Sequence, residues 1–597
     1  MIPMAKKDIA WDLSEIFPST VDPSIQKAIN NLTKMAEDFA KKYKGKIKDF
    51  SARELLKCIE EFEAFQMKLD DISLFAGLSF AANMTLSDTQ LLYDRVNKME
   101  AKLGKMLAFF DLEVGALVYK KPRIISEPIL VNYKHALERL RRKVEHQLSE
   151  VEEQLIIEKD QFGVRAWQDL QAKWLNTRMF KVKVEGKKKT LSYGEANGLL
   201  PHPDRATRES ANKSIYGLLG EYGEIFSTAL RTICNDWVNV CERRKYESPM
   251  HASLIANDND QQTIDNLLKA IEDHTDLYRR YLKLKAKMMG LPRLGCHDII
   301  APLPDAPDMK FDYDKARDLV IKAYSKFDED YALAVKDMFA KNHLDSSPRF
   351  GKQNGAFCAS WYSGKSAFIL SSFNGTLNDI YTLAHELGHA THDYYWERNQ
   401  TILNGRTPMV VAETASIFGE LLLTDLLLSE AKSDKEKKAI ICRVLDEAGM
   451  ATFQVTSRTW FEKSLYNAIK QEEFLDYKTI CKYWAAARDK IYGDTVEWFD
   501  ELEAEWTMKP HYYFANFRFY NYPYVYAQMF VYALYRKYLE ESKGFAPKFK
   551  KILSAGSSIS PVEIGKTVGL DVTDPGFWKL GMKQYEHFIE ELEKIVK

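Results

Sequence analysis

Residues 383–392 of this chain read Leu-Ala-His-Glu-Leu-Gly-His-Ala-Thr-His. Two histidines of this segment, His385 and His389, are four positions apart, which places them one above the other on the same face of an α-helix. Apolar residues recur nearby at the spacing of a core-facing helical stripe, at Ile380, Leu383, Ala384 and Leu387. The segment therefore predicts a helix that holds two imidazoles side by side.

This pattern predicts a zinc site. Two imidazoles at this helical spacing can bind one Zn²⁺ at about 2.0–2.1 Å each. Glu386 then lies beside the metal, where it can act as the general base that takes a proton from water. The chain has 12 histidines, and chance alone gives roughly 0.03 matches with an acidic residue after the first histidine. A catalytic zinc still needs a third protein ligand and an open position.

Candidates for the third ligand lie downstream, where residues 409–420 read Met-Val-Val-Ala-Glu-Thr-Ala-Ser-Ile-Phe-Gly-Glu. This stretch predicts the start of a second helix after a turn. Glu413 stands 24 residues after His389, far enough for the second helix to pack against the first and complete a His₂Glu site. Glu420 is interpreted as a carboxylate that orients a zinc-bound imidazole. Alternatively, both glutamates only solvate a helix surface, and His392 is interpreted as structural or as an outer partner of the site.

The composition limits which classes of protein this chain can belong to. A chain of 597 residues exceeds the ~250–300 residues at which one hydrophobic core stops growing, so we expect more than one lobe. A hydrophobic content of 46% and a charged content of 28% are typical of a soluble globular protein. The net charge of −1 gives no electrostatic case for binding nucleic acid or an anionic membrane. We therefore expect neither partner.

The sequence predicts a cytoplasmic location. The first seven residues, Met-Ile-Pro-Met-Ala-Lys-Lys, carry charge without an apolar run behind them, so no signal peptide is expected. No stretch approaches 18 uncharged apolar residues, and no membrane-spanning helix is predicted. The seven cysteines are scattered and form no CxxC pair. This distribution favours reduced thiols over a disulfide framework or a second zinc site.

Helical periodicity dominates the chain from about residue 20 to 175. Apolar and polar residues then alternate around a glycine at 179–191, which predicts a β-hairpin. We place a boundary near residue 195, which divides the chain into an N-terminal helical lobe, 1–195, and a catalytic domain, 196–597. The predicted fold class is mostly α.

Residues 355–374 are the main exception to the helical pattern. They contain two short β-like runs joined by Ser-Gly-Lys at 363–365, directly ahead of the histidine-bearing helix. The edge of such a hairpin could pair with an extended peptide through backbone hydrogen bonds and hold its scissile carbonyl near the metal. The alternative is that the hairpin only supports the helix.

A dense aromatic segment lies near the end of the chain, at residues 511–526. It contains six tyrosines and one histidine. Tyrosine and histidine can each donate a hydrogen bond to the oxyanion of a tetrahedral intermediate. By spacing alone, however, burial in a helical core is the favoured interpretation of this segment.

These segments together resemble the oligoendopeptidase F branch of the thimet-oligopeptidase-like zinc metallopeptidases. The strings HELGHATH at 385–392 and VVAETASIFGE at 410–420 carry the resemblance. Further matching segments follow the order of the family over essentially the whole chain, at Trp11–Pro18, Gly351–Cys358, Phe373–Asp379 and Phe519–Tyr524.

The resemblance implies a two-lobed helical metallopeptidase with a deep central channel and a small β-element beside the zinc helix. It implies one Zn²⁺ per chain and hydrolysis of internal bonds in short, unfolded peptides. It also implies that a histidine and a tyrosine of the late aromatic segment face the zinc and stabilise the oxyanion. His511 is the best match for the histidine, and Tyr520, Tyr522 and Tyr524 compete for the tyrosine role.

Two other functions stay open at this point. A zinc metallocarboxypeptidase of related helical fold would need a positive group for the terminal carboxylate of its substrate, and the sequence does not locate one. A non-catalytic helical interaction protein would use zinc only to staple two helices. A closed structural site of that kind usually has four protein ligands including cysteine, and none is near in sequence. Oligomeric state and side-chain preference are not predicted.

Overall fold

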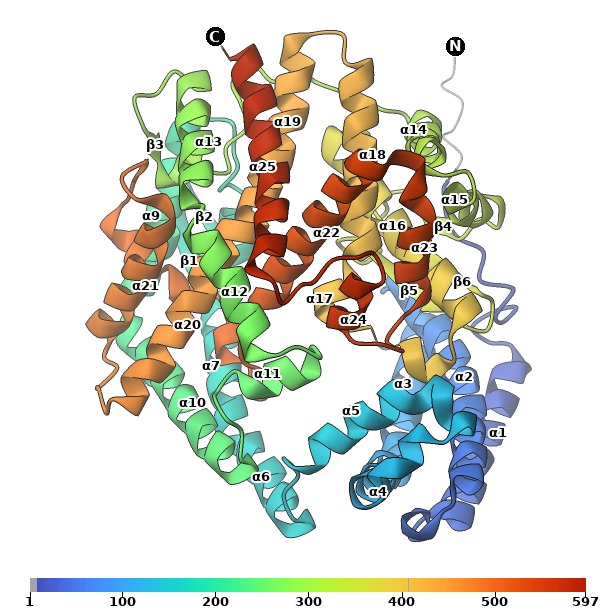
Figure 1. Cartoon of the computed structure of the whole chain (residues 1–597). Coiled ribbons are helices and arrows are strands. Elements are labelled where there is room, and N and C mark those ends of the chain that lie inside the picture. The colour runs from blue at the N-terminus through green and yellow to red at the C-terminus, as the bar shows by residue number, and fades with distance from the viewer. Residues whose placement is uncertain (1–7, 406, 597) are drawn as a thin grey trace. The chain divides into compact units, whose positions relative to one another are not determined.

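Helices make up most of the chain, and the strands are few and short (Figure 1). The computed structural model describes residues 8–405 and 407–596. The mostly α fold predicted from the sequence is confirmed. The segment at 1–7, for which no signal peptide is expected, lies outside the described residues.

The chain divides into two compact units, each built from separate stretches of sequence. Unit 1 combines the chain up to Val144 with Asp308–Glu430 and Lys537–Asp571. Unit 2 combines Glu145–Pro307 with Ala431–Arg536 and the chain from Val572 on. Compact units do not by themselves define independent domains, so the division into 1–195 and 196–597 stays a prediction.

Unit 1 carries the histidine-bearing helix, α16, and the helices of the N-terminal region. Its helices are α1 (Pro23–Tyr43), α2 (Ala52–Ala82), α3 (Ser87–Leu107), α4 (Phe109–Lys120), α5 (Lys134–Val144), α14 (Tyr313–Phe327), α15 (Tyr331–Ala340), α16 (Leu377–Asn399), α17 (Met409–Ala412), α18 (Thr414–Glu430), α23 (Ala546–Ser554) and α24 (Pro561–Lys566). Shorter 3₁₀ turns are η1 (Ile47–Asp49), η2 (Pro122–Ser126), η3 (Pro128–Tyr133), η5 (Ile402–Gly405) and η9 (Ser542–Gly544). Helices α1 to α5 share one apolar core, as their periodicity predicts.

Unit 2 carries the predicted hairpin and the late aromatic segment. Its helices are α6 (Glu150–Phe162), α7 (Val164–Asn176), α8 (Tyr193–Asn197), α9 (Arg205–Glu221), α10 (Gly223–Arg244), α11 (His251–Ala256), α12 (Gln261–Glu272), α13 (Thr275–Met288), α19 (Asp434–Gly449), α20 (Val455–Lys470), α21 (Tyr477–Tyr492) and α25 (Pro575–Ile595). Short turns are η4 (Cys296–Asp298), the π-helical η6 (Met450–Gln454), η7 (Asp500–Met508) and η8 (Pro510–Tyr513). Helix α22 (Tyr522–Glu541) begins in unit 2, and its residues from Lys537 on belong to unit 1.

Two small sheets lie in unit 2. Strands β1 (Met179–Val184) and β2 (Lys187–Ser192) form the antiparallel hairpin predicted at 179–191. Its turn residues, Glu185 and Gly186, have the positive φ angles that a two-residue hairpin loop requires. Strands β3 (Leu294–Gly295) and β7 (Val496–Glu497) pair in parallel.

The sheet that matters for the site lies in unit 1 and has the strand order β4-β6-β5. Strands β5 (Phe357–Trp361) and β6 (Ser366–Leu370) form the predicted hairpin directly ahead of α16. Strand β4 (Leu344–Asp345), which was not predicted, pairs in parallel with β6. Strand β5 is therefore an edge strand with one side left unpaired in this sheet.

Helix α16 begins at a capping box. The Thr376 hydroxyl accepts a hydrogen bond from the Asp379 backbone N–H, and the Asp379 carboxylate accepts one from the Thr376 N–H. The helix continues for 23 residues, to Asn399, and it confirms the helix predicted around the two histidines. Its N-terminal cap and its buried apolar stripe together fix the position of His385 and His389 relative to the rest of unit 1.

Within 8–405 and 407–596, no helix combines the length and the apolar character needed to cross a membrane. All seven cysteines are free thiols. A cytoplasmic location stays a prediction.

Candidate metal centre and active site

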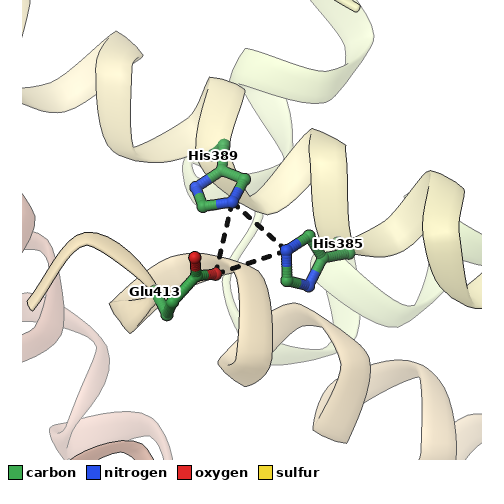
Figure 2. A group of neighbouring side chains, drawn as sticks. All are labelled: His385, His389 and Glu413. Carbon is green, nitrogen blue, oxygen red and sulfur yellow. Dashed lines mark hydrogen bonds and ion pairs between the residues drawn. The ribbon is translucent and has the colours of Figure 1, made fainter. Parts of the chain in front are cut away.

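Three side chains of unit 1 point toward a common centre (Figure 2). Glu413 Oε2 lies 3.3 Å from Nε2 of both His385 and His389. The two Nε2 atoms are 3.2 Å apart. Ligands held about 2.0–2.1 Å from a tetrahedral zinc lie about 3.3 Å from one another. The three atoms therefore fit three corners of such a site, with the fourth left for water or substrate.

The third member of this triangle, Glu413, lies at a break between two helices. The sequence predicts one helix through this stretch, but the structure ends α17 at Ala412 and begins α18 at Thr414. Ser416, in the first turn of α18, donates a hydrogen bond of 2.6 Å to Glu413 Oε2. The Glu413 carboxylate lies toward α16, where it contacts both histidines, and Ser416 holds it there.

A glycine lets α18 approach α16 closely. A Cβ atom placed on Gly388 would come within 2.5 Å of the Ala415 carbonyl oxygen and of Ser416 Cα. Since real Cβ atoms do not approach backbone this closely, any larger residue would force the two helices apart. Gly388 stands directly before His389, so this contact sets the distance between the two histidines and Glu413.

A second carboxylate of α18 contacts one of the imidazoles. Glu420 Oε1 lies 2.7 Å from His385 Nδ1. A proton on Nδ1 donated to this carboxylate leaves Nε2 free to bind a metal. The role of Glu420 as an orienting residue stays a prediction, and this contact supports it.

The electrostatics of the cluster favour a positive charge at its centre. Burial opposes protonation of His385, but hydrogen bonds with Glu413 and Glu420 outweigh it and raise the pKa of the imidazole well above its ordinary value. Burial likewise opposes ionisation of Glu413, yet its contacts with His385 and His389 hold the pKa of the carboxyl below its ordinary value. Such a cluster attracts a cation, whether protons or a metal ion.

Glu386 lies on α16 between the two histidines and is only 7% exposed. Burial raises the pKa of its carboxyl above the ordinary value, while His385 and His389 act in the opposite direction. A carboxylate with a raised pKa beside a metal centre suits a general base.

His392 also lies on the cavity side of α16, but it is not among the three converging ligand atoms. Burial lowers the pKa of this imidazole to about 4, so it is neutral near pH 7. It interacts with the backbone of Ala412, the residue before Glu413. This contact supports the interpretation of His392 as a structural partner of the site.

A cavity of about 580 Å³ adjoins the three candidate ligands. Its walls come from β5, from α16 and from the loop and short helix that follow α16. The lining residues are Ala356, Phe357, Cys358, Ser360, His385, Glu386, His389, His392, Asp393, Trp396, Gly405, Thr407 and Ala412. All of them belong to unit 1.

A family model described as peptidase family M3 matches residues 199–584, which is more than half of the chain. The chain belongs to peptidase family M3. A second family model, described as oligopeptidase F, matches residues 123–176. The M3 family is a family of zinc metallopeptidases. The resemblance inferred from the sequence motifs is therefore confirmed, and so is the expectation of a peptidase.

Curated relatives of this M3 peptidase span nearly its whole length. Oligopeptidase PepF of Bacillus subtilis is 27% identical over 603 aligned residues, covering 99% of this chain and 88% of the relative. An oligoendopeptidase F homologue of Lactococcus lactis is 27% identical over 596 residues, covering 99% of this chain and 97% of the relative.

Solved structures share the fold of this M3 peptidase. A protein from Chlamydophila abortus, assigned as a peptidase, superimposes with a TM-score of 0.86 at 21% identity, covering 98% of both chains. The oligoendopeptidase F of Enterococcus faecium superimposes with a TM-score of 0.69 at 23% identity, covering 96% of this chain and 99% of the other. At these identities the likeness establishes the fold alone.

The late aromatic segment of the M3 peptidase belongs to unit 2, whereas the candidate zinc ligands belong to unit 1. His511 lies in η8 and stacks on Tyr520, with ring centroids 5.8 Å apart. The hydroxyls of Tyr520 and Tyr524 contact each other. Tyr522 differs from them, because it is fully buried and donates a hydrogen bond of 3.1 Å to the Ser253 carbonyl.

Proposed function

We propose that this M3 peptidase is a zinc-dependent endopeptidase that hydrolyses internal bonds of short, unfolded peptides. The observation that carries the proposal is the triangle of His385, His389 and Glu413, whose spacing fits one tetrahedral Zn²⁺ with an open position. The names of the curated relatives, oligopeptidase and oligoendopeptidase, support the substrate class.

The proposed roles follow from the positions of the side chains around the candidate metal centre. Bound Zn²⁺ would supply Lewis acidity, which lowers the pKa of water toward about 7 and polarises a carbonyl. Glu386 would accept a proton from the attacking water and pass it to the leaving amine. Glu420 would keep His385 in the tautomer that offers Nε2 to the metal.

The unpaired edge of β5 is the proposed docking site for the peptide backbone. Phe357, Cys358 and Ser360 of this strand line the same cavity as His385 and Glu386. An extended peptide that pairs with β5 would therefore run alongside the candidate zinc ligands. A folded substrate offers no free strand, which supports a preference for unfolded peptides.

His511 and a tyrosine are proposed to stabilise the oxyanion, on the basis of the family resemblance. Burial lowers the pKa of His511 to about 3, with Arg458 and Lys509 acting in the same direction, so its imidazole is neutral. Of the three tyrosine candidates we propose Tyr520 or Tyr524. Tyr522 is a poorer candidate, since its hydroxyl is buried against Ser253.

Peptides with blocked ends test the reaction class. We expect the zinc-loaded chain to cleave N-acetylated, C-amidated peptides of ten residues or so at internal bonds, because pairing with β5 needs no free terminus. A chelator should stop the cleavage and added Zn²⁺ should restore it. Mass spectrometry of the products, with a folded protein as the second substrate, checks both points.

The alternatives make different predictions in the same assay. A metallocarboxypeptidase would leave C-amidated peptides intact, and a non-catalytic zinc protein would cleave nothing. Efficient digestion of the folded protein would contradict the proposed substrate class while leaving the zinc site intact.

A glutamine at position 420 tests the orienting carboxylate. We expect Glu420→Gln to weaken zinc binding by about 10–100-fold, because the amide loses the charge that holds the Nδ1 proton of His385. A competition titration against a chelator measures the affinity. Glu430→Gln is the matched control, since Glu430 lies on the same helix but pairs with Lys322 at the surface. Equal zinc affinity in the two variants would contradict the role of Glu420.

A further inference from the structure

The cavity beside the candidate zinc site contains a carboxylate that the proposed mechanism does not use. Asp393 lies on α16, one helical turn beyond His389, and lines the cavity wall. At 1.5 Å of rise per residue, its Cα lies about 6 Å along the helix from that of His389. Two residues of an extended peptide span about 7 Å. Asp393 therefore lies within reach of a substrate group close to the cleaved bond.

Few groups of the protein balance the negative charge of the Asp393 carboxylate. Its Oδ1 accepts a hydrogen bond of 2.8 Å from Trp396 Nε1. Its Oδ2 faces the thiol of Cys358 at 3.9 Å, and a thiol is a weak donor. Among residues 8–405 and 407–596, no lysine or arginine forms an ion pair with Asp393, and the charge that favours its ionisation is that of the His389 imidazole. Asp393 is partly exposed where it lines the cavity, so a cationic group of a ligand could reach its carboxylate and pair with it.

A second carboxyl group, Glu397, lies one turn further along α16 and is only 1% exposed. Its Oε1 accepts a hydrogen bond of 2.6 Å from the hydroxyl of Ser360, which lines the cavity. Its Oε2 is buried with no hydrogen-bond partner. The nearby Lys365 ammonium donates to the backbone carbonyl of Glu397 and lies over the Tyr362 ring. Its charge favours ionisation of the Glu397 carboxyl but does not outweigh the effect of burial.

The two carboxyl groups interact with each other, so they titrate as a pair. Burial, together with the neighbouring Asp393, raises the pKa of the Glu397 carboxyl above its ordinary value. Burial also raises the pKa of the Asp393 carboxyl, whereas Trp396, His389 and Cys358 act in the opposite direction. Of the two groups, Asp393 lines the cavity and is held by Trp396, so it is the one that a cationic ligand can reach.

We propose that Asp393 is a specificity-determining residue whose carboxylate binds a protonated amine or a guanidinium of the peptide substrate, about two residues from the cleaved bond. The apolar walls from Phe357 and Trp396 would cover the alkyl part of a lysine or arginine side chain. The α-ammonium of a short peptide has the same chemistry. This inference rests on the proposed function, since it assigns the substrate class of the same cavity.

The experiment compares a cation with its neutral isostere. Internally quenched peptides would share one cleaved bond and carry arginine, lysine or citrulline one, two or three residues from it on either side. Each peptide is made with a free and with an acetylated N-terminus. The zinc-loaded full chain is assayed as wild type, as Asp393→Asn, and as the surface control Glu430→Gln. Binding of the same peptides to zinc-loaded Glu386→Gln, with and without Asp393→Asn, gives Kd without turnover.

At one of the tested positions, we expect the peptide with arginine to have a kcat/KM at least about tenfold higher than the peptide with citrulline, mainly because its KM is lower. The Kd values of the two peptides should differ by a similar factor. In Asp393→Asn this ratio should fall to about one, while Glu430→Gln keeps it. A preference that survives acetylation assigns the cation to a side chain, and one that acetylation abolishes assigns it to the N-terminus.

Three results would overturn the inference. The first is a ratio near one at every position in wild-type protein that still cleaves the citrulline peptides, which would leave the proposed function standing. The second is an unchanged ratio in Asp393→Asn. The third is an equal loss of kcat for all peptides together with weaker zinc binding, which would make Asp393 a positioning residue for His389. Failure to cleave any peptide would refute the proposed function, and the Kd ratio would still decide the role of Asp393.

Discussion

Replacement of Glu386 by glutamine is expected to lower kcat by about 10²–10⁴-fold while zinc stays bound. The amide keeps the size and polarity of the side chain but cannot accept a proton from water. None of the three converging ligand atoms belongs to Glu386, so the metal site itself should be unaffected. Steady-state assays with a blocked peptide, combined with metal analysis of the purified protein, measure the two effects separately.

The stability of the same variant provides an internal control. Burial raises the pKa of Glu386, which means that its charged form is disfavoured in the folded protein. A neutral amide removes that cost, so in the metal-free protein the free energy of unfolding of Glu386→Gln should equal or exceed that of the wild type at pH 7. Full activity in Glu386→Gln would end the proposed mechanism. Loss of activity accompanied by loss of zinc or of helical signal would mean that Glu386 has a structural role instead.

Replacement of Glu413 by glutamine is expected to abolish activity by a different route, through loss of the metal. Glu413 Oε2 is one of the three converging ligand atoms and the only anionic one. Its removal should weaken zinc binding by more than the about 10–100-fold typical of residues that only orient a ligand. Chelator competition measures the affinity, and activity at saturating Zn²⁺ shows whether the loss can be reversed.

Two variants on α18 serve as controls for the zinc affinity of Glu413→Gln. Ser416→Ala removes the hydrogen bonds from the Ser416 hydroxyl to Glu413 Oε2 and to the Glu413 carbonyl but keeps the Glu413 carboxylate, so its zinc affinity should lie between those of the wild type and Glu413→Gln. Glu430→Gln, a surface change on α18, should leave the affinity at the wild-type value. If Glu413→Gln bound zinc as tightly as Glu430→Gln, the third ligand would have to be another residue.

Local periodicity determined much of this protein from sequence. The spacing of His385 and His389 depends only on the pitch of a helix, and Ile380 and Leu387 indicate which side of that helix is buried. The hairpins at 179–192 and 357–370 follow from alternation and from turn residues, which also act over a few positions. Glu413 could also be proposed as a ligand from the sequence, since its distance from His389 leaves enough chain for a second helix to fold back and pack against the first.

Tertiary structure decided what depends on contacts between distant segments. No local pattern reports the break in the helix at Glu413 or the close contact of α18 with Gly388, and that contact joins segments that are distant in sequence. Pairing of β4 with β6 joins short strands whose two-residue ladder carries no periodic signal. Tyr522 and Tyr520 likewise differ in their surroundings, because the hydroxyl of Tyr522 donates a hydrogen bond to the carbonyl of Ser253, which is more than 260 residues away in sequence. Sequence fixes which side chains a helix presents, because that is a property of neighbouring residues. Only the folded chain fixes which other side chains they meet, because burial and close contact join residues that are far apart in sequence.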